Sequence, residues 1–210
     1  MKMLDLFCGA GGAGEGYSRA GWQVTGVDNV PQPDYPFTFV LGDALEYLEE
    51  HWMEFDAIHA SPPCLASSTL TKGTHGNRTG HLDLVPTVRR RLASLPLPTI
   101  VENVKSASLR PDLTLCGLMF GLPTYRHRYF EVSFPVPRLP HPKHESRVDG
   151  WRHGRRYKGS IIGVWGHSGG WKGSLEDWQK ALDTPWITRK ATLAQAIPPA
   201  YTEHIAGAIP

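Results

Sequence analysis

The sequence is poor in cysteine and contains no long apolar run. Its 210 residues include three cysteines, an odd number without close spacing, which argues against a disulfide framework and for a reducing compartment. No secretory start and no apolar run of membrane-spanning length is present, because Asp5 and a glycine-rich turn interrupt the N-terminus at once. These absences predict a soluble cytoplasmic protein.

The sequence also lacks a recognisable set of metal ligands. His141 and His144 are close enough in the chain to suggest a metal, but no second pair of ligands stands at the spacing of a helical or zinc-finger site. We therefore predict that the protein holds no metal.

Positive charge is not abundant overall, but it is concentrated in one segment. Lys and Arg outnumber Asp and Glu by only 22 to 20. Residues 135–158 contain seven basic and two acidic residues, a net charge of +5, so the remainder carries −3. A local basic patch is a place for a polyanion to bind, and Arg152, Arg155 and Arg156 are its candidate contacts. The alternative is a solvated loop that happens to be basic.

What is present suffices for one core with many turns. The chain is 40% hydrophobic and contains 22 Gly and 18 Pro, which indicates a single α/β domain with at most a small appendage. Short apolar runs predict strands, and amphipathic segments between them predict helices. The predicted strands are 3–7, 22–28, 37–41, 55–60 and 98–101, and the main predicted helices are 13–20, a short one ending near 51, and 82–94.

A glycine-rich turn, residues 8–16, follows the first predicted strand. Glycines let the backbone approach a ligand at a helix N-terminus, which is the physical basis of nucleotide cradles, although such turns can also serve packing alone. Asp28 and Asp43 follow the second and third strands, where open α/β sheets line a crevice. Each aspartate could instead be an ordinary helix N-cap.

Two reactive groups are expected at the ends of the next two strands. Cys64 follows Pro62 and Pro63, which stiffen the turn after the fourth strand, and it precedes a polar stretch. We therefore predict an accessible nucleophilic thiol rather than a buried, inert one. Glu102 follows the fifth strand; a carboxylate there is costly to bury unless it is paired, which favours a functional role.

The second half of the chain is less regular. Alternation in the strand after residue 125 would put Arg126 and Arg128 on one face, as a structural ion pair or as an anion clamp, and spacing alone does not choose. Residues 135–185 interleave tryptophans with basic residues, which suits stacking on bases, although the tryptophans could also form a small core. The end of the chain, 192–209, is predicted to be helical with a break at 197–199.

Together these motifs resemble the DNA cytosine-5 methyltransferase family in order and spacing. The match extends to about Phe134, resumes over roughly the last twenty residues, and is absent between. The resembling segments are Asp5 to Gly12, Pro62-Pro63-Cys64, Glu102-Asn103-Val104, Arg126-His127-Arg128 and Gln195 to Pro199.

The resemblance implies a Rossmann-like sheet with helices on both faces and S-adenosylmethionine as the cofactor. It implies that Cys64 adds to C6 of cytosine, that Glu102 contacts the ring, and that Arg126 and Arg128 belong to the pocket. The remaining implied contacts are Phe7, Gly9, Gly11, Asp28, Asp43 and Gln195 for the cofactor, and Pro63 and Asn103, with the three basic-patch arginines, for the substrate.

The resemblance also implies a division of the chain and a partner. Residues 1–134 with 187–210 correspond to the catalytic domain, and 135–186 to a reduced target-recognition region. DNA is the expected partner, in a bacterial or phage-infected cell. The shortness of 135–186, and departures at Leu65, Ser67, Thr124 and Gln195, leave RNA or a free pyrimidine nucleotide open as the substrate. An inactive DNA-binding relative and an amino-methyltransferase are further alternatives, the last disfavoured by Cys64.

Overall fold

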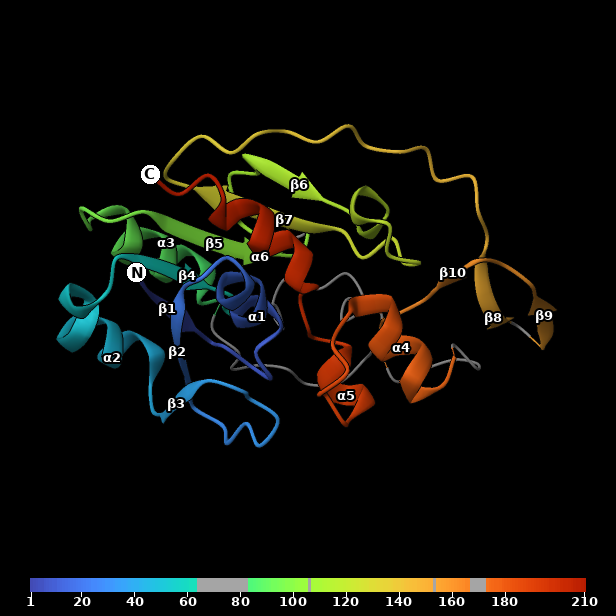
Figure 1. Ribbon diagram of the computed structural model, residues 1–210, viewed down its shortest axis with the longest axis horizontal. Helices are drawn as coiled ribbons and strands as arrows, with labels where there is room; N and C mark the ends of the chain where they lie inside the picture. Colours follow the sequence, from blue (N-terminus) through green and yellow to red (C-terminus); the bar gives the residue numbers. More distant parts are fainter. Residues whose placement is uncertain (64–82, 106, 153, 167–172) are drawn as a thin grey trace.

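The structure, a computed structural model, is built on a seven-stranded sheet in the order β3-β2-β1-β4-β5-β7-β6 (Figure 1). It describes residues 1–63, 83–105, 107–152, 154–166 and 173–210. Strands β1 to β5 run parallel, whereas β7 is antiparallel to both of its neighbours. The strands are β1 Lys2–Leu6, β2 Gln23–Asp28, β3 Thr38–Leu41, β4 Ala57–Ala60, β5 Thr99–Asn103, β6 Leu113–Leu115 and β7 Arg128–Val132. The predicted α/β fold with a Rossmann-like sheet is confirmed.

Helices cover both faces of this sheet, as the two-sided burial of its strands requires. Successive side chains of β1 point to opposite faces: Leu4 and Leu6 pack with α2 and α3, whereas Met3 packs with Tyr17 of α1 and Ala206 of α6. The helices are α1 Gly12–Arg19, α2 Ala44–His51, α3 Val85–Ala93 and α6 Pro199–Ala206, with short 3-10 helices at Trp52–Glu54 and Gly117–Phe120.

Helix α1 packs on α6 through glycine. A Cβ added to Gly16 would lie 2.1 Å from the Pro199 carbonyl oxygen and 2.1 Å from Thr202 Oγ1, and one added to Gly12 would lie 2.4 Å from the Ile197 carbonyl oxygen. The Thr202 hydroxyl donates a hydrogen bond to the Ala13 carbonyl at 2.7 Å. For these two glycines the packing alternative is therefore correct.

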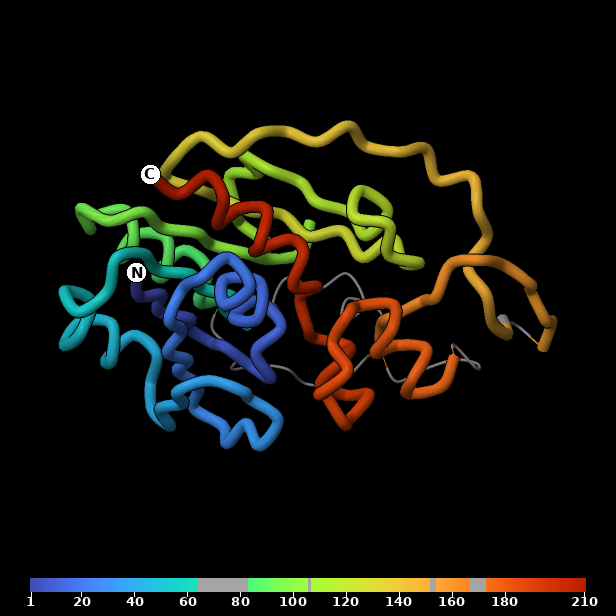
Figure 2. The backbone as a smooth tube through the Cα atoms, in the orientation of Figure 1, coloured from blue at the N-terminus to red at the C-terminus, as the bar shows by residue number. Residues whose placement is uncertain are grey.

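A second sheet stands apart from the first, at the far end of the molecule from α2 and α3 (Figure 1). Its order is β10-β8-β9, formed by β8 Val148–Arg152, β9 Arg155–Tyr157 and β10 Ile161–Ile162. Residues 135–147, which form neither helix nor strand, carry the chain from β7 to this sheet (Figure 2).

A small core around α4, Leu175–Leu182, joins this region to the glycine-rich turn. Trp178 is buried in it with Val164, Ala10 and Leu193, the last residue of α5, Lys190–Leu193. Trp178 thus has a packing role, whereas Trp151 and Trp165 are 44% and 37% exposed; Trp171 lies outside the described residues. Within the part of the chain that the structure describes, no helix has the length and apolarity that crossing a membrane requires.

Candidate active site

The glycine-rich turn and the Pro62-Pro63 turn leave the sheet side by side. They follow β1 and β4, which are neighbours: Leu6 pairs with Ala60, and the Ser61 N–H donates a hydrogen bond to the Leu6 carbonyl at 3.1 Å. The order of strands reverses between β1 and β4, and such a switch point is where open α/β sheets bind ligands.

Strand β5 brings Asn103 to the same edge. Val101 pairs with Ala60, and the buried side chain of Asn103 donates from Nδ2 to the Pro62 carbonyl at 2.9 Å. Its Oδ1 accepts from the Val104 N–H at 2.8 Å, so Asn103 fixes the turn through its amide. Pro63 is exposed next to it. The predicted nucleophile, Cys64, lies outside the described residues.

Glu102 lies within β5 rather than beyond its end, with 6% of its surface exposed. Arg128 Nε is 2.7 Å from Glu102 Oε1, which is close enough for an ion pair. The N–H direction does not suit a hydrogen bond, however, and Oε1 accepts none from the described residues. Burial raises the pKa of Glu102, while Arg128, Arg126 and a hydrogen bond from Ser61 lower it without cancelling the rise. The carboxyl group is thus buried and paired with Arg128.

Arg126 precedes β7 instead of lying within it, and its guanidinium binds backbone carbonyls. It donates to Val164 at 2.7 Å, to Ala194 at 2.8 Å and to Ala196 at 2.7 Å. The Tyr201 hydroxyl in turn donates to the Arg126 carbonyl at 2.7 Å. Arg126 therefore ties the C-terminal segment to the edge beside Glu102, while Arg128 makes the direct contact with the carboxylate.

Three residues behind Glu102 were not expected from the sequence. The Tyr17 hydroxyl lies 2.9 Å from His59 Nδ1, and His59 Nε2 lies 2.7 Å from Ser61 Oγ. Burial lowers the pKa of His59 to about 3, so the ring is neutral and has one donor nitrogen. Because an ionised Glu102 only accepts, Ser61 donates to it, which makes His59 Nε2 the donor to Ser61 and Tyr17 the donor to Nδ1. No motif marks this chain, since its members come from α1 and β4.

The turn after β1 has the geometry of a ligand cradle at one point. Phe7 and Gly9 have φ values of 57° and 50°, and a Cβ on Gly9 would meet nothing within 4 Å. Asp28, at the end of β2, accepts from the Gly9 N–H and from the Val30 N–H, both at 3.0 Å. The open space at Gly9, whose N–H is bound by the Asp28 carboxylate, suits a nucleoside-bearing cofactor.

The other predicted cofactor contacts, Asp43, Gly11 and Gln195, each have a different structural environment. Asp43 Oδ1 accepts from the Leu45 and Glu46 N–H groups at 2.8 and 3.1 Å, so Asp43 is the N-cap of α2. Gly11, with φ 81°, packs on Tyr35, whose ring carbons would lie 3.0 Å or more from an added Cβ. Gln195 is exposed in the turn after α5.

A buried acid beneath this turn was also missed from the sequence as a site residue. Asp5 is fully buried in β1, and its Oδ2 accepts from the Tyr35 hydroxyl at 3.3 Å. Burial raises its pKa well above the ordinary range, against the hydrogen bond from Tyr35. Oδ1 has no hydrogen-bond partner in the described part of the chain. An uncharged Asp5 keeps the floor of the cradle neutral.

The predicted nucleic-acid arginines differ in how they are held. Arg156 makes an ion pair with Asp149 at 2.8 Å and also donates to the Gly150 carbonyl at 3.3 Å. Arg155 is exposed, with its guanidinium carbon 5.8 Å from the centroid of the Tyr157 ring. The side chain of Arg152 lies outside the described residues. Arg155 is thus better placed than Arg156 to reach a phosphate.

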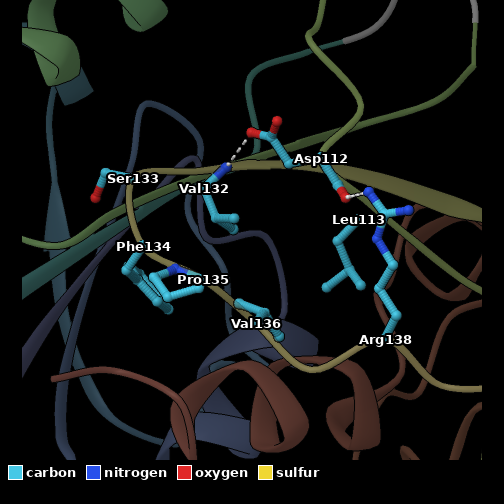
Figure 3. A pocket seen from close by; sticks show the side chains of 8 residues that line it. All are labelled: Asp112, Leu113, Val132, Ser133, Phe134, Pro135, Val136 and Arg138. Carbon is cyan, nitrogen blue, oxygen red and sulfur yellow. Dashed lines mark hydrogen bonds between the residues drawn. The ribbon is translucent and has the colours of Figure 1, made fainter.

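A separate pocket of about 390 Å³ opens elsewhere on the molecule (Figure 3). Val132, which lines the pocket, pairs with Ile100 near the beginning of β5. Glu102 lies toward the other end of β5. The pocket is therefore at the opposite edge of the sheet from the candidate site. Its lining residues are Asp112, Leu113, Val132, Ser133, Phe134, Pro135, Val136 and Arg138.

The sequence is similar to those of two type II methyltransferases. Type II methyltransferase M.AgeI of Thalassovita gelatinovora is 24% identical over 73% of this chain and 44% of its own length. Type II methyltransferase M.AplI of Arthrospira platensis is 27% identical over 64% of this chain and 46% of its own length. The chain thus spans less than half the length of these curated relatives. No protein-family model matches it.

A solved structure extends the likeness to nearly the whole chain. The Entamoeba histolytica methyltransferase EhMeth superimposes with a TM-score of 0.58 at 12% identity, covering 98% of this chain and 96% of its own. The fold is that of the Rossmann-like methyltransferases. Within that class the chain resembles the DNA cytosine-5 methyltransferase family, and its type II relatives confirm the resemblance.

Proposed function

We propose that this protein transfers a methyl group from S-adenosylmethionine to C5 of cytosine in DNA, through a transient bond between Cys64 and C6. The observation that carries the proposal is the hydrogen bond from Asn103 to the Pro62 carbonyl. Because that bond fixes the turn before Cys64 to the strand that holds Glu102, a pyrimidine bound at Glu102 would have the thiol-bearing turn beside it.

The residues have chemically complementary tasks in this proposal. Cytosine C5 is a poor nucleophile, but addition of the Cys64 thiolate at C6 turns the ring into an enamine, whose C5 can take the methyl group. Glu102 hydrogen-bonds or protonates the N3/N4 edge, which prevents negative charge from accumulating on the ring. Loss of the C5 proton then breaks the bond between sulfur and C6 and frees Cys64. Burial raises the pKa of Glu102, which is the direction that favours a proton-supplying carboxyl group.

The cofactor would bind at the turn after β1. Gly9, Asp28 and Phe7 offer an open backbone approach, a carboxylate at a strand end and an aromatic face. Bound S-adenosylmethionine supplies an electrophilic methyl group on a positively charged sulfur. The neutral, buried Asp5 adds no fixed negative charge beneath it.

DNA is the proposed substrate, and one observation supports a second candidate substrate, RNA or a free pyrimidine nucleotide. In duplex DNA the cytosine must leave the stack, at a cost of roughly a few kcal/mol that protein contacts must offset. Arg156 is engaged by Asp149 within its own hairpin, which reduces the cationic surface of the short 135–186 region. The same chemistry on RNA or on a free pyrimidine nucleotide is therefore the alternative. We place the protein in the cytoplasm in either case.

The test is methyl transfer from tritiated S-adenosylmethionine to duplex DNA, single-stranded DNA, RNA and free nucleotides, compared side by side. We expect incorporation into duplex DNA, none with Cys64→Ala and a large decrease with Glu102→Gln. Glu54→Gln, a change on the surface of the 3-10 helix after α2, is the matched control and should behave as wild type. Incorporation only into RNA or nucleotides would move the proposal to its alternative.

Trapping separates an active enzyme from an inactive DNA-binding relative. DNA that contains 5-fluorocytosine cannot lose its C5 substituent as a proton, so the bond to Cys64 should persist and survive denaturation. Wild type should form this adduct only with cofactor present, and Cys64→Ala should not form it. Full methylation by Cys64→Ala would disprove covalent catalysis.

A further inference from the structure

Four potential metal ligands converge at the junction between the sheet and the segment that follows it. One ligand atom from each of Cys116, His127, His141 and His144 lies within 4.8 Å of all the others. Cys116 Sγ is 3.3 Å from His144 Nε2, and His127 Nε2 is 3.0 Å from His141 Nε2. We propose that these residues bind one structural zinc ion. The proposal does not depend on the proposed methylation.

The donor set is one that Zn²⁺ takes with a full shell of protein ligands. Imidazole nitrogen and thiolate sulfur are both ligands of Zn²⁺, and four of them fill its tetrahedral shell. With Zn–N near 2.0 Å and Zn–S near 2.3 Å, ligand atoms at tetrahedral angles lie about 3.3 to 3.6 Å apart. The two short separations are near this range already. His141 and His144 are exposed, so their side chains can make the adjustment of about 1 Å that the longest separation needs.

The close approach of these side chains suits a shared cation. The facing nitrogens of His127 and His141 can share only one proton if both rings are neutral, and the rings repel if both are charged. On binding, the Cys116 thiol would release its proton to solvent.

The surroundings hold the ligands in place. Cys116 follows β6 and is buried, and His127 immediately precedes β7. The ring of Tyr125 stacks on His144 with centroids 3.8 Å apart, and the Tyr125 hydroxyl donates to the Ser146 carbonyl. Support of this kind around a ligand is typical of metal sites.

Sequence spacing did not reveal the site because its ligands come from two parts of the chain. Cys116 and His127 are next to β6 and β7 of the sheet, whereas His141 and His144 belong to residues 135–147, which form neither helix nor strand. A zinc ion would fasten this segment to the sheet edge beside Arg126 and Arg128. The expectation of no metal rested on the missing second ligand pair, which the fold supplies.

The experiment measures metal in the intact chain. Protein purified without chelator, then equilibrated with Zn²⁺ and a competing chelator and desalted, should retain about one zinc per chain by elemental analysis. His141→Gln with His144→Gln, and separately Cys116→Ser, should lower zinc affinity by more than the 10- to 100-fold typical of changes outside the ligand shell. His51→Gln, a change at a half-buried histidine at the end of α2 that is not part of the cluster, is the matched control and should bind as wild type.

A second readout protects the test against misfolding of the Cys116 variant. Cobalt added to the metal-free wild type should give the visible absorption of a tetrahedral thiolate complex, which the double histidine variant should lack. Circular dichroism of the double variant should match wild type, because both changed side chains are exposed. Wild-type protein that retains no zinc, or a double variant that retains as much as wild type, would overturn the proposal and leave the proposed methylation untouched.

Discussion

The Asn103 side-chain amide donates a hydrogen bond to the Pro62 carbonyl at 2.9 Å, across the gap between β5 and the turn after β4. Asn103→Ala should leave this buried carbonyl without a partner, at a cost of about 1–3 kcal/mol in the free energy of unfolding. It should also loosen the turn before Cys64. A displacement of about 1 Å at a reacting group can lower a rate about 100-fold.

For this variant we expect a large fall in kcat with unchanged affinity for S-adenosylmethionine, measured by single-turnover methylation and calorimetry. Asn103→Asp is informative beside it, because it keeps the acceptor for the Val104 N–H but places an oxygen against the Pro62 carbonyl. Wild-type kcat in both variants would mean that the bond does not position the thiol.

The ion pair between Arg128 and Glu102 predicts a pH-dependent loss of stability. Arg128→Met would leave the carboxyl group buried without its cation, which typically costs about 3–5 kcal/mol when the acid is ionised. Without Arg128 the pKa of Glu102 rises further above its ordinary value of 4.5. A carboxyl with a raised folded-state pKa contributes its stability fully below the unfolded-state pKa and loses it as pH rises through the folded-state value. The penalty should therefore be smaller at pH 5 than at pH 8.

Urea unfolding of Arg128→Met at these two pH values measures the effect. The double variant Glu102→Gln with Arg128→Met removes the titrating group and should show no such pH dependence. Arg110→Met, which breaks an exposed ion pair with Asp112, should cost only about 0–1 kcal/mol. An equal penalty for Arg128→Met at both pH values would show that Glu102 does not titrate in this range.

Much of this site could be anticipated from local sequence. The end of each parallel strand is visible as an apolar run followed by a polar residue, and parallel strands bring such ends to one edge. Asp28 and the turn before Cys64 are examples, and their placement follows from pattern alone. The strand boundaries were also close, because runs buried on both faces are continuous and apolar.

Contacts between distant segments could not be anticipated. Gly9 and Gly16 belong to one glycine-rich run, yet the space at Gly9 is open while Gly16 packs on α6, which is almost two hundred residues away in the chain. Similarly, Arg126 and Arg128 are two residues apart, but one binds carbonyls of the C-terminal segment and the other pairs with Glu102. Spacing carries no information on which partner each residue meets.

The hydrogen bonds that link Tyr17, His59 and Ser61 to Glu102 predict that removing the Tyr17 hydroxyl changes the pKa of Glu102. Tyr17→Phe removes the donor to His59 Nδ1. Nδ1 then has no partner in either tautomer, so the tautomer in which Nε2 donates to Ser61 is no longer favoured. In the other tautomer, Ser61 donates to Nε2 and no longer to Glu102. The pKa of Glu102 should rise further, because the Ser61 hydrogen bond lowers it.

The alkaline limb of the pH profile of kcat/KM should therefore move to higher pH in Tyr17→Phe. Tyr47→Phe on α2, whose ring stacks on His51, is the control and should leave the profile in place. If the profile of Tyr17→Phe coincided with that of wild type while stability fell, the Tyr17 hydroxyl would have only a packing role.

Asp43 is assigned two tasks that one substitution can separate. Asp43→Ser keeps a good N-cap for α2, so the melting temperature should stay near that of wild type. Asp43→Ala removes the cap and should lower the free energy of unfolding by about 1 kcal/mol. If the carboxylate also contacts the cofactor, both variants should bind S-adenosylmethionine more weakly by calorimetry. Wild-type affinity in Asp43→Ser would assign Asp43 to capping alone.

The contact between α1 and α6 predicts that a methyl group added at Gly16 destabilises the protein, although alanine favours the helix. Gly16→Ala gains about 1 kcal/mol from helix propensity. Its Cβ, however, would lie 2.1 Å from a backbone oxygen of Pro199 and 2.7 Å from the Glu203 nitrogen, which cannot move without displacing α6. Overpacking of this kind typically costs about 1–3 kcal/mol or more. We expect a net loss of stability in urea unfolding.

Gly42→Ala is the control, because an added Cβ there meets nothing within 4 Å. Its free energy of unfolding should stay within about 0.5 kcal/mol of wild type. An equal result for the two variants would mean that α6 is not packed on α1 as described.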